Sequence, residues 1–80
     1  MSFFDDMPLS TKVSLLEQAR TQLATELTSI LLRHGIDPSV FDVNNKEEIS
    51  NYEFSGDVYR VEQVCEGLTI IETKLVALGV

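Results

Sequence analysis

The stretch LLEQARTQLATEL, residues 15–27, decides the fold expected of this chain, because its leucines recur at the spacing of one helix face. The same spacing extends from Leu9 to His34 without a glycine or proline, and Gly35 is a typical helix stop. At 100° per residue, the apolar residues fall on a single stripe. They are Leu9, Val13, Leu16, Leu23, Leu27, Ile30 and Leu31. This pattern predicts a long amphipathic helix over about residues 9–34.

A second stripe, with alternating steps of three and four residues, lies near the end of the chain. Its members are Val61, Val64, Leu68, Ile71, Leu75 and Leu78. They predict a helix over about residues 57–78 with coiled-coil spacing, capped by Ser55 or Asp57 and stopped by Gly79. Gly67 interrupts the stripe at a cost of about 1 kcal/mol relative to alanine, so we expect a close backbone approach or a weak point there.

Residues 35–56 connect the two predicted helices and carry apolar side chains of their own. Asp37 followed by Pro38 indicates a first helical turn, and residues 46–54 form either another short helix or an irregular segment. We therefore predict an all-α fold with one helical domain over residues 1–80. It is a long antiparallel helical hairpin with a short, partly helical acidic connector, and it completes a bundle by association.

The chain has 80 residues, a size at which only about 60% of the surface of the unfolded chain is buried on folding. Domains this small often gain stability from disulfides, a metal or association. Cys65 is the only cysteine and His34 the only histidine, so the sequence offers neither an internal disulfide nor zinc-ligand spacing. Association is the remaining source of added stability that we expect.

The localisation is expected to be cytoplasmic, without contact to a membrane. The N-terminal sequence MSFFDDMPLS has no basic region followed by an apolar run, and no apolar stretch reaches the roughly 18 residues of a membrane span. A single cysteine is compatible with a reducing compartment.

The negative charge of the chain is concentrated in its middle. The net charge is −7, and residues 37–66 hold eight acids and two bases, a net charge of −6. The acids are Asp37, Asp42, Glu47, Glu48, Glu53, Asp57, Glu62 and Glu66. They would repel nucleic acid and anionic membranes, so we expect no direct binding to either. They either attract a basic protein surface, with Glu47, Glu48 and Glu53 as contacts, or simply keep the protein soluble.

Arg20 lies in the middle of the first apolar stripe, where a cation calls for an explanation. If the helices run antiparallel with His34 opposite Asp57, then Arg20 faces Glu72, and the two form a structural pair that fixes the register. Alternatively, Arg20 lays its stem along the leucines and brings its guanidinium to water, or it meets an acid of another chain.

Leu15, Tyr59 and Ile70 are apolar residues that lie outside the two stripes. Recognition by helix-on-helix burial uses such side chains, so they are the predicted apolar contacts to a partner. Isolated exposed apolar residues are also normal on protein surfaces, and the alternative is that these three are simply solvated.

No residue pattern in the sequence is typical of a reactive site. Cys65 lies on an apolar stripe and is expected in the core, and His34 is expected to cap a helix end. No phosphate loop, dinucleotide fingerprint or HExxH motif occurs, and the acids lack the spacing of a calcium loop. We expect no catalytic, cofactor-binding or metal-binding residues and no enzyme activity.

The sequence thus predicts a non-enzymatic protein–protein interaction module that acts as a small assembly factor, adaptor or chaperone-like subunit. Its partner would be a protein, either a second copy in a homodimer or another chain in a larger complex. The alternative function is an acidic inhibitor that mimics nucleic acid and blocks a DNA- or RNA-binding protein. The eight acids within residues 37–66 motivate this alternative.

Overall fold

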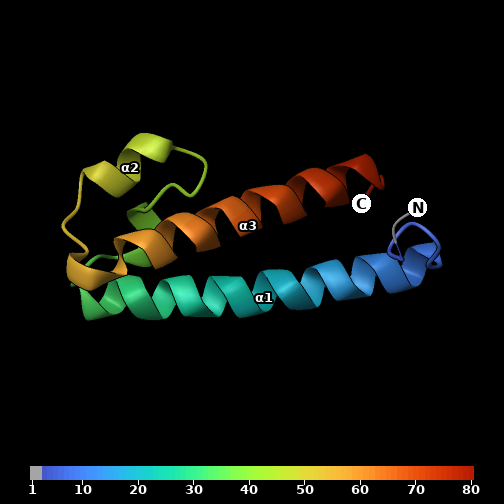
Figure 1. Cartoon of the computed structure of the whole chain (residues 1–80), viewed down its shortest axis with the longest axis horizontal. Coiled ribbons are helices and arrows are strands. Elements are labelled where there is room, and N and C mark those ends of the chain that lie inside the picture. The colour runs from blue at the N-terminus through green and yellow to red at the C-terminus, as the bar shows by residue number, and fades with distance from the viewer. Residues whose placement is uncertain (1–2) are drawn as a thin grey trace.

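The computed structural model describes residues 3–80, apart from the side chain of Lys46, and residues 1–2 of the predicted domain lie outside the described part. The described residues are mostly helical and contain no strand. In chain order, the elements are α1 (Leu9–Arg33), η1 (Pro38–Val40), α2 (Lys46–Ser50), η2 (Ser55–Asp57) and α3 (Val58–Ala77). The two long helices, α1 and α3, pack against each other, as the two apolar stripes predict (Figure 1).

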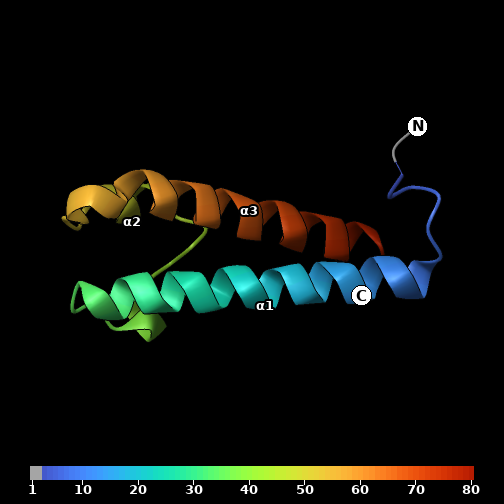
Figure 2. The ribbon, with the colours of Figure 1, turned by 60° about the horizontal axis from the view of Figure 1, so that its bottom comes forward.

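The path of the chain places the start of α1 beside the end of α3. Both ribbon views show α1 running the length of the molecule and α3 returning alongside it (Figures 1 and 2). Side-chain contacts agree with this path, because Glu26 contacts Arg60 and Arg20 contacts Glu72. The molecule measures 41 × 21 × 19 Å. Its longest dimension is close to the length of α1, the longer helix, at 1.5 Å per residue.

The buried side chains form two clusters of unequal size. The larger cluster lies at the connector end and contains Leu27, Ile30, Leu31, Ile36, Phe41, Phe54, Val61, Val64 and Cys65. The smaller one contains Leu16, Ile71 and Leu75. The difference arises because the connector adds Ile36, Phe41 and Phe54 at one end only.

An aromatic cluster anchors the connector to the helices. Phe54 is completely buried, and its ring centroid lies 5.5 Å from that of His34, 6.3 Å from that of Phe41 and 6.1 Å from that of Tyr52. The first two of these contacts are edge-to-face, an arrangement that aromatic rings favour. Phe54 is therefore the residue around which the connector packs.

Asx caps organise the short elements of the connector. Asp37 Oδ1 accepts a hydrogen bond of 2.9 Å from the Ser39 N–H at η1, and Asn45 Oδ1 accepts one of 3.0 Å from the Glu47 N–H at α2. The bond from Ser39 lowers the pKa of the Asp37 carboxyl. Asp and Asn favour such turns because their short side chains reach the backbone two residues on.

Glycines end both long helices, as predicted. Gly35 has φ +74°, and the Ile36 N–H next to it donates to the Leu31 carbonyl at 2.8 Å. This closing pattern satisfies carbonyls that the last turn of α1 leaves open. Gly79, with φ +81°, follows α3 in the same way.

The prediction of a side-chain cap for α3 was wrong. Asp57 occupies the N-cap position, but its side chain makes no capping bond. Its Oδ2 instead accepts hydrogen bonds from Arg33 and His34, because a carboxylate is bound more strongly by a cationic guanidinium than by an uncharged backbone N–H. Ser55 is no cap for α3 either; it is the first residue of η2 and has φ +53°.

Leu9 and Gly67 show where the packing of α1 against α3 ends and where it leaves no room for a side chain. Leu9 was predicted to face α3 but is 55% exposed, because α3 ends at Ala77 before it reaches the level of the first turn of α1. At Gly67 the neighbour is a side chain: a Cβ there would lie 2.8 Å from Leu23 Cδ1, so the missing Cβ leaves room for Leu23.

Candidate protein-interaction surface

A fixed and exposed tyrosine marks the outer side of α3. Tyr59 is 71% exposed, yet its hydroxyl accepts a hydrogen bond of 2.8 Å from Gln63 Nε2. Gln63 Oε1 in turn accepts from Arg60 Nη1 at 3.3 Å, and Arg60 Nη2 donates to Glu26 Oε1 at 2.6 Å. A second bond from Arg60 Nε to Glu26 Oε2 makes this contact bidentate. The ring is thus connected through three side chains to α1.

The ionisation of the Glu26–Arg60 pair supports this network. The hydrogen bond from Arg60 lowers the pKa of Glu26, and the same bond raises the pKa of Arg60. Both groups therefore keep their charges over a wider pH range than isolated side chains, and the bidentate geometry limits the rotamers of Arg60.

A groove of about 740 Å³ lies between the connector and α3. Its apolar lining residues are Val43, Ile49, Tyr52, Val58, Cys65 and Ile70. The charged lining residues are Glu62 and Glu66, both on α3 and both exposed. We call this feature the α2–α3 groove. It combines an apolar interior with an acidic wall.

Cys65 forms part of the groove and of the core. Its side chain is buried, and this burial raises the pKa of the thiol. A buried neutral thiol behaves as a small apolar side chain, which agrees with the position of Cys65 on the apolar stripe.

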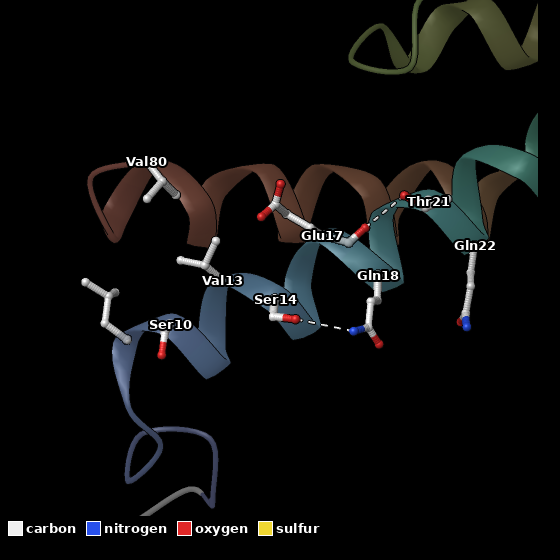
Figure 3. A pocket seen from close by; sticks show the side chains of 9 residues that line it. Ser10, Val13, Ser14, Glu17, Gln18, Thr21, Gln22 and Val80 are labelled. Carbon is white, nitrogen blue, oxygen red and sulfur yellow. Dashed lines mark hydrogen bonds between the residues drawn. The ribbon is translucent and has the colours of Figure 1, made fainter.

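A second depression, broad and open, lies along α1 and has a volume of about 870 Å³ (Figure 3). Val13 and Val80 lie at one end of it, and neutral polar side chains follow along the helix. Gln18 Nε2 donates a hydrogen bond to Ser14 Oγ at 3.3 Å, so some of these polar side chains are bonded to one another. Glu17 is the charged residue of the lining. This face of α1 is therefore nearly neutral, in contrast to the acidic middle of the chain.

The three predicted apolar contacts do not form one surface. Ile70 is 49% exposed and lines the α2–α3 groove, and Tyr59 lies on the same helix. Leu15 is exposed on α1, eleven residues before Glu26, the residue that contacts Arg60 next to Tyr59. At 1.5 Å per residue this separation is roughly 16 Å along the helix axis. Tyr59 and Ile70 are also eleven residues apart on α3, so the three side chains are spread along the molecule.

The three predicted acidic contacts lie on or next to α2. Glu47 and Glu48 are in its first turn, and Glu53 follows the helix, before η2. Glu47 and Glu53 are exposed, whereas Glu48 is partly buried. None of the three lines the α2–α3 groove, whose connector wall is uncharged.

The structure brings Arg20 and Glu72 together at the surface. Arg20 Nη1 lies 3.6 Å from Glu72 Oε2, and Arg20 Nη2 lies 3.6 Å from Glu17 Oε2. The Arg20 side chain is 43% exposed and that of Glu72 60% exposed, so the guanidinium leaves the apolar stripe and sits between two acids. Exposed pairs of this kind contribute about 0–1 kcal/mol.

Two groupings were missed, one of them only in part. The first is the contact of Asp57 with Arg33 and His34, of which the sequence reasoning used only the position of His34 opposite Asp57. The second is the network that holds Tyr59. The spacing of Tyr59 and Gln63, four residues apart on a helix, was a signal for the second grouping. The first had no local signal, because its members are brought together only by the return of the chain.

Comparison with known proteins leaves the function to be inferred from these surfaces. No family model matches the chain, and no curated protein or solved structure is significantly similar to it. Within the described part of the chain, no group of three His, Cys, Asp or Glu side chains is placed to hold a metal ion. None of the described helices has the combined length and apolarity that a membrane span requires.

Proposed function

We propose that this protein is a non-enzymatic protein–protein interaction module that binds its partner by helix-on-helix packing. Tyr59 carries this proposal, because its ring is largely exposed while its hydroxyl is held by Gln63. An aromatic side chain that is already fixed loses little conformational entropy when a partner covers it, and buried tyrosines are common energetic centres of interfaces. The corresponding biological roles are a small assembly factor, an adaptor or a chaperone-like subunit.

The limited core also supports association. The smaller cluster contains three buried side chains, and the half of α3 beyond the connector leaves Val76 exposed. An antiparallel hairpin whose acidic connector covers one end gains further apolar burial when a second copy or another chain completes a bundle. We place this function in the cytoplasm, a reducing compartment that suits the free thiol of Cys65.

Mimicry of nucleic acid is the alternative, and the charge of −6 on residues 37–66 motivates it. Several of these carboxylates already have internal partners. Asp57 Oδ2 accepts from Arg33 and His34, and Asp42 Oδ1 accepts from the Asn44 N–H. A mimic needs free carboxylates at the spacing of phosphates, so these internal bonds favour the interaction module.

Two variants distinguish these functions. In the interaction module, Tyr59→Ser combined with Ile70→Ser removes apolar contacts, and we expect loss of the partner that co-purifies with the tagged wild-type chain. Leu32→Ser is the matched control, because Leu32 is also exposed but lies on α1. Molar mass from light scattering reports the same loss when the partner is a second copy.

The opposite pattern would overturn the proposal. A mimic would lose its partner on charge reversal of Glu47, Glu48 and Glu53, with a steep dependence on salt beforehand. It would keep most of its affinity in the Tyr59→Ser/Ile70→Ser variant.

A further inference from the structure

We propose that the α2–α3 groove binds a basic amphipathic helix of a partner protein. This inference rests on the proposed function and deepens it, because it names the surface and the chemistry of the partner. Its first support is the shape of the groove, whose two walls come from the connector and from α3. Val43 and Tyr52 belong to the connector wall, and Val58 and Ile70 to α3.

The interior of the groove suits the apolar face of a helix. Val58 and Ile70 are exposed within it, and Cys65 lies between them along α3. A volume of about 740 Å³ accommodates several large side chains. Amphipathic helices present such side chains at intervals of three, four and seven residues, which is the arrangement that an elongated groove accepts.

The negative charge beside the groove favours a partner helix whose polar face is basic. Glu62 and Glu66 are four residues apart on α3, and no basic side chain that the structure describes forms an ion pair with either. Glu47 and Glu53 add exposed acids on or beside α2. A partner with lysines or arginines beside its apolar stripe would complement the acidic α3 wall.

The same charges disfavour the other occupants. A second copy of this chain carries a net charge of −7, and its Arg20, Arg33 and Arg60 already contact acids of their own chain. Nucleic acid and anionic membranes are repelled by the acidic α3 wall. A basic protein helix is therefore the occupant whose apolar and charged groups both match the groove.

The test uses the full chain and a synthetic amphipathic peptide of leucine and lysine, about 18 residues long, or about five helical turns. A peptide of the same composition, scrambled to remove the helical spacing, is the control. Binding is measured by calorimetry at low and high salt.

We expect the leucine–lysine peptide to bind more weakly as salt rises. The Glu62→Gln/Glu66→Gln variant, which changes only exposed side chains, should weaken binding by about fivefold or more. Equal binding of the scrambled peptide would overturn the inference, and so would unchanged affinity in this variant.

Failure of this inference can be distinguished from failure of the proposed function. If the natural partner is lost from Tyr59→Ser but retained by Glu62→Gln/Glu66→Gln, the interaction module stands and the groove is not its binding site. If the natural partner is retained by both variants, both proposals fail.

Discussion

His34 Nε2 lies 2.8 Å from Asp57 Oδ2, and this contact joins the last turn of α1 to the start of α3. Arg33 Nη2 donates to the same oxygen at 2.6 Å. The His34 ring also packs edge-on against the buried ring of Phe54. One carboxylate therefore connects both long helices at the end where the connector leaves and returns.

This relationship predicts a specific loss of stability in acid. The hydrogen bond from Arg33, followed by that from His34, holds the pKa of Asp57 below its ordinary value of 3.8. Because the folded-state pKa is lowered, the contribution of Asp57 to stability is complete above pH 3.8 and is lost as the pH falls through the lowered folded-state value. We expect Asp57→Asn to unfold at lower urea concentration than the wild type at about pH 7, and the difference to shrink towards about pH 2. A difference that stays constant with pH would contradict this assignment.

Phe54 is predicted to be the most sensitive core position. It is completely buried and contacts three other rings, so Phe54→Ala leaves a cavity at the connector end. The expected cost is about 3–5 kcal/mol, a large part of the stability of a domain this small. Phe54→Leu should cost less, and Val40→Ala, at an exposed site, should have little effect. Equal urea midpoints for Phe54→Ala and Val40→Ala would show that this packing is wrong.

The contact between Gly67 and Leu23 predicts an interaction between two substitutions. Gly67→Ala gains about 1 kcal/mol of helix propensity, but its Cβ displaces Leu23 Cδ1, which lies 2.8 Å from that position. We expect a net change within about 1 kcal/mol. In a Leu23→Ala background the same substitution should be more stabilising, because the obstructing atom is gone. Urea unfolding of the four chains gives the coupling, and a coupling of zero would refute the close approach.

The surface pair of Arg20 and Glu72 is predicted to contribute little. Both side chains are largely exposed, so Arg20→Leu should change the unfolding free energy by less than about 1 kcal/mol. A double-mutant cycle with Glu72→Gln isolates the pair from the packing of the Arg20 stem. Strong coupling, or loss of assembly in Arg20→Leu alone, would instead indicate that the pair fixes the register or meets another chain.

The packing of two long helices could be predicted because each helix repeats its apolar residues at helical spacing. Spacing reports which face is buried but not how far the partner helix extends, so the exposure of Leu9 was missed. The helix ends at Gly35 and Gly79 could also be predicted from the local sequence, because glycine readily adopts the left-handed conformation that closes a helix.

The lateral contacts could not be predicted from spacing. Asp57 is a plausible cap in isolation, and only the return of the chain offers it the stronger donors Arg33 and His34. The contact of Arg60 with Glu26 depends on the rotamers of two long side chains, which a sequence pattern does not fix. The α2–α3 groove was missed because it exists only where the connector folds back on α3.

The native mass of the chain tests the interaction module most directly. Light scattering after size exclusion is applied to two preparations of the wild type and of the Tyr59→Ser/Ile70→Ser variant. The first is the purified chain alone, and the second is the tagged chain isolated from its native cells together with any bound partner. We expect the wild type to run above the 9.0 kDa of a single chain in at least the second preparation, and the variant to run as a single chain in both. A wild type that runs at 9.0 kDa in both preparations would contradict the proposed function.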